Sequence, residues 1–244
     1  GRARFDPARE VCGNGVDDTG NGAVDCADST CKDTLECRPP APGRLELYIV
    51  SQDPFGIKAL DAMKPLLQTF GDEIRFELHF IGEEKDGKLV SRHGEGEVRE
   101  NKRQLCAVTK TPPAQAMKYL WCRNKTLIEE AGAARKVVRS EAGPERTAAE
   151  AAAAKAEDSN WKACAKESGI DAELIAACVT NEATGLLAAD YKKTASLGIK
   201  PSPTWVLNGH VKFSATAAKD IRDKICENNP EFAGCARELD TRTP

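Results

Sequence analysis

Ten cysteines constrain this 244-residue chain more than any other feature of its sequence. Their number is even, and no two of them have the C-x-x-C spacing that is typical of zinc sites and dithiol redox centres. Since only three histidines are available as further metal ligands, the pattern favours structural disulfides and an oxidising compartment outside the cytoplasm. The alternative is a set of buried free thiols in a cytosolic protein.

The cysteines fall into three groups along the chain. Cys226 and Cys235 are close enough in sequence to form a local clamp on the last expected helix. Four cysteines near the N-terminus are expected to pair among themselves, with three possible connectivities, and four more are expected to staple a helical region. These two groups are Cys12, Cys26, Cys31 and Cys37, and Cys106, Cys122, Cys164 and Cys178.

The bulk composition excludes several classes of partner and location. A net charge of −3 and an isoelectric point near 5.8 give no reason to expect nucleic acid or an anionic membrane as a partner. No apolar stretch approaches the roughly 18 to 20 residues that a membrane-spanning helix needs, so we expect no transmembrane segment. The chain opens with the polar stretch GRARFDPARE, in which no signal peptide is visible.

The beginning of the chain differs in composition from the rest and indicates a separate module. Residues 1–40 hold four cysteines and a cluster of Asp, Asn and Gly, with almost no periodic apolar pattern. The stretch RPPAPG at 38–43 is a stiff linker, because consecutive prolines keep the backbone extended. We therefore place a domain boundary near residue 40 and a larger domain over 41–244.

The larger domain begins with a predicted strand-helix-strand unit. Residues 44–50 (RLELYIV) and 73–82 (EIRFELHFIG) have the apolar patterns that are typical of strands. Residues 55–69 have apolar side chains at helical spacing, and Pro65 among them predicts a kink. A unit of this length implies that the two strands pair in parallel through a right-handed crossover.

Helices are predicted for most of the middle of the chain. We expect a helical insertion over about 97–190. Within it, the Ala-rich and charged stretch 141–159 has strong helix propensity and little to bury. We interpret the region 129–160 as an exposed helical arm, and a partner-binding role for this arm is the alternative.

The last part of the chain predicts a hairpin and a helix. Within 204–214, Asn208-Gly209 separates two strand-like runs, which is a strong signal for a hairpin turn. Helical patterns precede this hairpin at 184–196 and follow it at 216–228. The order βαβ, helical block, ββα resembles an α/β thioredoxin-like fold with a helical insertion, here preceded by a small disulfide-rich loop module.

The N-terminal module contains a candidate calcium site. The stretch DDTGNGAVDCAD (17–28) can be aligned with the loop pattern of an EF-hand, which places Gly22 at the position of the sharp turn. Because Thr and Asn replace two of the usual carboxylates, we expect weak affinity, toward the millimolar extracellular range. The aligned ligands are the side chains of Asp17, Thr19, Asn21, Asp25 and Asp28 and the carbonyl of Ala23.

No helix pattern flanks this loop, so it is not an EF-hand domain. The stretch CGNGVDDTGNGAVDCADSTC (12–31) resembles short Asp/Gly/Cys modules at the starts of bacterial surface and secreted proteins, especially those of myxobacteria. The resemblance implies a bacterial protein of the periplasm, the cell surface or the medium. The alternative to calcium is a cross-linked turn in which Asx side chains bind only the backbone.

Two motifs of the larger domain carry a second resemblance. SQDPFG at 51–56 follows the first strand and matches the turn SQCPYG, with Asp53 in place of the cysteine. PSPTWVLNG at 201–209 resembles a loop that presents a cis-proline to an active site, which makes Pro203 the candidate. From about 44 to 236 the chain thus resembles a DsbA-like thioredoxin-fold family that is related to the gamma-interferon-inducible lysosomal thiol reductase.

A third motif is in register with the same family. SRHGEGEVRENKRQLC at 91–106 resembles the thiol reductase signature C-Q-H-G-x2-E-C-x2-N-x4-C. Ser91 and Val98 stand where that signature has its first two cysteines, so the spacing is kept while two thiols are missing. His93 is a candidate base only through this resemblance. The matching positions are His93, Gly94, Glu97, Asn101 and Cys106.

The substitution at the turn argues against the activity that the resemblance implies. Thiol-disulfide exchange requires a thiolate that attacks a sulfur and later leaves it, and Asp53 provides a carboxylate instead. Gly56 stands at the second position of a C-x-x-C, so the turn has no resolving thiol either. Asp53 suits a helix N-cap, with Pro54 as the first helical residue. The alternative is that Asp53 binds a ligand or a cation in the old cleft.

The sequence therefore predicts a redox-inactive, non-catalytic thioredoxin-fold protein that binds other protein subunits in an extracytoplasmic assembly. Two alternatives stay open, namely a thiol-disulfide oxidoreductase that uses an atypical cysteine, and a solute-binding module that uses the old active-site cleft. The expected cofactor is calcium, and no redox cofactor is expected. No Ser/His/Asp arrangement, P-loop or paired-carboxylate motif stands out in the sequence.

Overall fold

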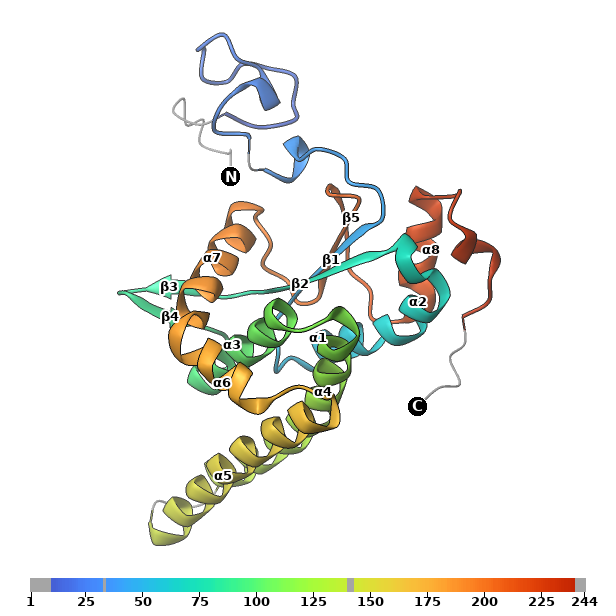
Figure 1. The fold of residues 1–244 in the computed structure, drawn as a ribbon. Helices are drawn as coiled ribbons and strands as arrows, with labels where there is room; N and C mark the ends of the chain where they lie inside the picture. The colour runs from blue at the N-terminus through green and yellow to red at the C-terminus, as the bar shows by residue number, and fades with distance from the viewer. Residues whose placement is uncertain (1–9, 33, 140–142, 240–244) are drawn as a thin grey trace.

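The computed structural model of the chain describes residues 10–32, 34–139 and 143–239. Within these residues, a central four-stranded sheet has the order β2-β1-β5-β6 (Figure 1). β1 pairs in parallel with β2 and antiparallel with β5, so the expected strand-helix-strand unit and the C-terminal hairpin are confirmed. The strands are β1 (Arg44–Ile49), β2 (Arg75–Phe80), β5 (Thr204–Leu207) and β6 (Val211–Phe213).

β1 is deeply buried because it has a neighbouring strand on each side and a covered surface on each face. Leu45, Leu47 and Ile49 lie in the main hydrophobic core. Side chains alternate between faces along a strand, so Tyr48 lies on the opposite face, where it joins a smaller apolar cluster. Residues of α1 (Pro54–Asp61), α2 (Met63–Phe70) and α8 (Ala218–Asn228) also belong to the main core.

The helix predicted over 55–69 is two helices in the structure. α1 ends at Asp61 and α2 begins at Met63, so the interruption comes just before Pro65 and not at it. The physical reason is that a proline ring clashes with the carbonyl four residues earlier. Pro65 therefore fits near the start of a new helix, and the preceding helix has to end first.

The expected helical insertion lies between β2 and β5. α3 (Glu95–Lys110), α6 (Ala172–Asn181) and α7 (Ala183–Ser196) pack against one another, and α7 also contacts β2. α4 (Pro113–Arg139) and α5 (Pro144–Glu167) form a long helical hairpin that projects away from the sheet (Figure 1). No helix in the described residues is both long and apolar enough to cross a membrane.

A small hairpin was missed by the sequence prediction. β3 (Glu83–Lys85) and β4 (Lys88–Val90) pair antiparallel after β2. Their turn is Asp86-Gly87, and both residues have positive φ, 51° and 72°. Asp-Gly is a typical turn pair of this kind, so the signal was present, but the flanking runs are too short and too polar to stand out.

All ten cysteines lie within the described residues and form five disulfides. Each of the three expected groups pairs internally. In the insertion, one bridge joins α3 to α6 and the other joins α4 to α5. The pairs are Cys12–Cys31, Cys26–Cys37, Cys106–Cys178, Cys122–Cys164 and Cys226–Cys235.

The end of the N-terminal module contacts the sheet. Leu35 is buried and lies in the smaller apolar cluster with Tyr48. Arg38 forms an ion pair with Glu46 of β1, at 2.9 Å. The domain boundary near residue 40 stays a prediction, since residues on both sides of it contribute to the same surface of the sheet.

We expect removal of a disulfide to destabilise the chain according to the loop that it closes. The Cys106–Cys178 bridge spans 72 residues and the Cys226–Cys235 bridge spans 9. Loop-closure entropy gives losses of about 4 kcal/mol for a Cys106→Ala/Cys178→Ala variant and about 2.5 kcal/mol for Cys226→Ala/Cys235→Ala. Urea unfolding measures both values, and a larger loss for the second variant would contradict the expectation.

Candidate functional site

The turn after β1 holds Asp53 as the N-cap of α1. Its backbone is extended, with φ −80° and ψ 125°, and Pro54 is the first helical residue. The Asp53 carboxylate accepts hydrogen bonds from the backbone N–H groups of Phe55 (3.3 Å) and Gly56 (3.2 Å). The structure thus gives Asp53 the capping geometry that its residue type favours.

A third bond ties Asp53 to the loop before β5. The hydroxyl of Ser202 donates to the Asp53 carboxylate at 2.8 Å and accepts from the N–H of Val50 at 3.0 Å. The peptide bond between Ser202 and Pro203 is cis. The turn, the start of α1 and the Pro203 loop therefore form one hydrogen-bonded unit, in which Asp53 is only 8% exposed.

Gly56 lies in a closely packed position. A Cβ atom at this residue would lie 3.0 Å from the Val50 carbonyl oxygen and 3.1 Å from the Ser202 hydroxyl. A side chain at this position, such as a resolving cysteine, would require these neighbours to give way by a few tenths of an ångström. The packing therefore favours glycine at this place for a steric reason as well as for a chemical one.

Glu97 joins the turn after β1 to the neighbouring loop by hydrogen bonds. It is fully buried, and its carboxylate accepts from the N–H of Gln52 (2.8 Å) and from the hydroxyl of Ser91 (2.7 Å). It also contacts His93, whose backbone N–H donates at 3.0 Å and whose Nδ1 lies 3.1 Å away. The motif positions 91, 93 and 97 thus meet beside the Asp53 turn, although sequence spacing alone did not show what joins them.

A pocket of about 490 Å³ opens next to this unit. Val50 and Ile199 contribute apolar surface to its wall, and the exposed residues Arg92 and Lys200 are also part of its lining. Its volume falls within the range of small-molecule sites, roughly 300 to 1,000 Å³. Asp53 and Pro203, both described, are not among its lining residues, so the pocket is displaced from the predicted cleft.

Four of the predicted calcium ligands form two contacting pairs, and Asp25 lies apart from them. The hydroxyl of Thr19 donates to Asp17 at 3.3 Å, and the amide of Asn21 donates to Asp28 at 2.6 Å. Asp25 instead accepts from the backbone N–H groups of residues 13–15, at 2.7 to 3.0 Å. The backbone N–H of Ala23 donates to Asn21, at 2.8 Å.

Hydrogen bonds lower the pKa values of two carboxylates of this loop, Asp17 and Asp28. The N–H of Gly22 is the main cause that lowers the pKa of Asp17, and the hydroxyl of Thr30 is the main cause that lowers the pKa of Asp28. Glu10 is not among the predicted ligands, but it is a buried carboxylate that accepts from the N–H groups of Asp18, Thr19 and Asp25. Glu10 lies before the aligned loop, so the loop pattern could not include it.

A second polar cluster on the sheet was also missed. Glu46, Glu77 and His79 meet on the face of β1 and β2 that is opposite to the main core. In the sequence His79 is only a polar position of a strand. The signal could have come from strand register, since Glu46 pairs with Glu77 and Tyr48 pairs with His79 in the parallel ladder.

Comparison with known proteins supports the fold. No family model matches the chain, and no curated protein matches it in sequence. Among solved structures, a candidate protein-disulfide isomerase from Pseudomonas syringae is similar, with a TM-score of 0.50 and 15% sequence identity over 77% of this chain and 93% of the other. The chain thus has a thioredoxin-like fold with a helical insertion, and its five disulfides indicate an oxidising environment.

We expect Asp53→Ala to destabilise the protein by about 1 to 3 kcal/mol, because it removes a helix cap and a hydrogen-bond partner of Ser202. Asp53→Asn is the matched control, since asparagine is an equally good cap, and it should cost under about 1 kcal/mol. Urea unfolding of both variants checks the values. Equal stability of Asp53→Ala and the wild type would show that the cap is not structural.

Proposed function

We propose that this chain is a redox-inactive thioredoxin-fold protein that serves as a binding or structural subunit of an extracytoplasmic assembly. One observation carries the proposal. At the place where the resembling family has its reactive cysteine, a carboxylate is fixed by three hydrogen bonds. A carboxylate in this position can cap the helix, but it cannot form and release a mixed disulfide.

The competing function is thiol-disulfide exchange through one of the existing cysteines. A reactive thiolate is favoured at a helix N-terminus, where the dipole lowers the thiol pKa. Cys164, Cys178 and Cys226 instead lie in the last turns of α5, α6 and α8. Cys106 and Cys122 are internal to α3 and α4. None of these cysteines has the helix position that would activate it.

An insulin-reduction assay tests this proposal directly. We expect no turnover above the uncatalysed rate for the wild type, because position 53 has no thiol and the cysteines of α3 to α6 and α8 lie away from the helix N-termini that would activate them. Robust turnover that one Cys→Ser substitution abolishes would overturn the proposal and support the oxidoreductase.

An Asp53→Cys variant tests whether the turn still has the electrostatics of a reactive site. The new thiol should have a lowered pKa, because it stands at the N-terminus of α1. The matched control is Ser196→Cys, at the exposed C-terminal end of α7, where the helix dipole acts in the opposite direction. The pH dependence of thiol alkylation measures both pKa values, and a lower value at position 196 would contradict the expectation.

Solute binding is a second candidate because of the 490 Å³ pocket beside the turn. The pocket has apolar walls, and its lining holds two cations, Arg92 and Lys200, against one carboxylate, Glu83, a balance that suits a small amphipathic anion. Octanoate should raise the melting temperature of the wild type, and filling the pocket by Val90→Trp should remove this shift. The control is Val24→Trp in the N-terminal module, which should keep it. An unchanged melting temperature of the wild type would count against this function.

Calcium is the proposed cofactor of the N-terminal module, with Asp17, Thr19, Asn21 and Asp28 as the ligands. Their support is that these side chains are joined in two contacting pairs and that both carboxylates have lowered pKa values. Asp25 lies apart from these pairs, because its oxygens accept from the turn at 13–15, outside the aligned loop, whereas the oxygens of Asp17 accept from residues 20–22 within it.

Calcium at millimolar concentration should raise the melting temperature of the wild type, and Asp17→Asn should abolish the rise. Asp25→Asn should lower the melting temperature without calcium and still respond to the ion. An exposed carboxylate of the larger domain, Asp72, provides the control Asp72→Asn, which should behave as the wild type. A melting temperature that neither calcium nor chelator changes would reject the site.

A further inference from the structure

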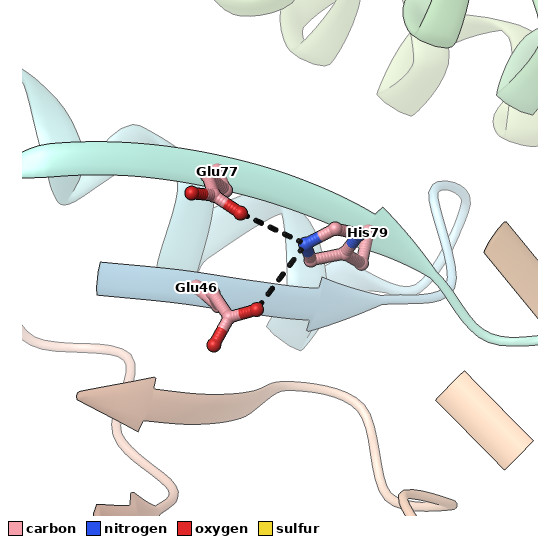
Figure 2. A group of neighbouring side chains, drawn as sticks. All are labelled: Glu46, Glu77 and His79. Atoms are coloured by element: carbon pink, nitrogen blue, oxygen red, sulfur yellow. Dashed lines mark ion pairs between the residues drawn. The ribbon is translucent and has the colours of Figure 1, made fainter. Parts of the chain in front are cut away.

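Three ligand-type side chains converge on the sheet, far in sequence from the calcium loop. Figure 2 shows Nε2 of His79 between the carboxylates of Glu46 and Glu77, which come from the neighbouring strands β1 and β2. Nε2 lies 3.6 Å from Glu46 Oε1 and 3.7 Å from Glu77 Oε2. Within the described part of the chain, this is the group of three His, Cys, Asp or Glu ligand atoms that all lie within 4.8 Å of one another.

These separations are close to those of ligands around one metal ion. Zinc binds histidine nitrogen and carboxylate oxygen at about 2.0 to 2.2 Å, usually in a tetrahedron. The edge of such a tetrahedron is about 3.3 to 3.6 Å, by geometry from those bond lengths. The observed distances of 3.6 and 3.7 Å need only small side-chain movements to reach this value.

The orientation of His79 is also that of a metal ligand. Its Nδ1 lies 2.6 Å from Asp190 Oδ1, and the other oxygen of Asp190 accepts from the N–H of Phe80 at 2.7 Å. The ring is stacked on Tyr48, with centroids 4.7 Å apart. A carboxylate that accepts from Nδ1–H leaves Nε2 as the more basic ligand atom. Such a carboxylate is the usual second partner of a metal-bound histidine.

The proposed ligand atoms already have partners in the protein. Glu46 Oε1 accepts from Arg38 Nη2 at 2.9 Å and from the hydroxyl of Tyr48 at 3.1 Å. Nζ of Lys193 lies 3.2 Å from His79 Nε2 and 3.3 Å from Glu46 Oε1. The Lys193 side chain is 39% exposed, so it can turn into solvent from its position on α7. Its partner Glu46 is fully buried, so Zn²⁺ has to replace the positive charge of Lys193 beside this carboxylate, which a divalent ion does.

We propose that Glu46, Glu77 and His79 form a zinc site in which Zn²⁺ displaces the ammonium group of Lys193. Oxygen-only calcium loops select hard cations, whereas imidazole suits zinc, so this site and the N-terminal loop take different ions. Arg38 and Arg44 also contact Glu46, and their positive charge keeps the affinity of the site moderate.

The test is a zinc titration of the full, chelator-treated chain in competition with a chromophoric chelator at pH 7.5. The wild type should bind zinc at this site, and His79→Gln should weaken the binding at least tenfold. Glu77→Gln should weaken it too, and it provides a second variant at a partly exposed residue if His79→Gln does not fold. His93→Gln and His210→Gln, at the two other histidines, should leave the affinity unchanged.

Lys193→Gln distinguishes a metal site from an internal ion-pair network. If the ammonium competes with zinc, its removal should tighten binding several-fold, whereas a purely structural lysine would leave zinc affinity unchanged or weaken it. Absence of zinc binding to the wild type, insensitivity to both His79→Gln and Glu77→Gln, or no tightening by Lys193→Gln would each overturn the proposal.

Discussion

A fully buried carboxylate in the central strand is the constraint to which the rest of the structure is fitted. Glu46 lies in β1 with no exposed surface. An uncompensated charge in such a place costs several kcal/mol, so the fold has to bring cations to it. Arg38 arrives from the end of the N-terminal module and binds both carboxylate oxygens at 2.9 Å, and Lys193 arrives from α7. The pairing therefore joins the linker, the sheet and the helical insertion at one point.

Buried carboxylates at the turn after β1 also need compensating partners, but their partners are not cations of Lys or Arg. Asp53 and Glu97 are both buried, but their hydrogen-bond donors are backbone N–H groups, hydroxyls and the histidine of the motif. Such donors stabilise a carboxylate by direct hydrogen bonding, and at Asp53 the dipole of α1 adds to it. Position 53 is therefore at the start of α1, and the group at this place is a carboxylate that is hydrogen-bonded to its surroundings.

Local features of the fold could be predicted from the sequence because they depend on neighbouring residues. Apolar alternation gave the strands at 44–50 and 73–82, and Asn208-Gly209 gave the hairpin. Strand register is a different matter. Glu46 and Glu77 are separated by 30 positions, and only the parallel ladder places them side by side. Disulfide connectivity within a group, the contacts of the carboxylates in the loop 17–28 and the burial of Glu10 depend in the same way on the closure of the chain.

One chemical requirement relates the ten disulfide-bonded cysteines to the absence of a cysteine at position 53. Thiol-disulfide exchange begins with a thiolate, and a thiolate attacks any disulfide that it can reach. A chain stapled by five bridges is safest when it has no activated thiol of its own, and its helical cysteines lie away from the helix N-termini that would activate them. An aspartate at position 53 caps α1 without placing a thiolate at that helix N-terminus.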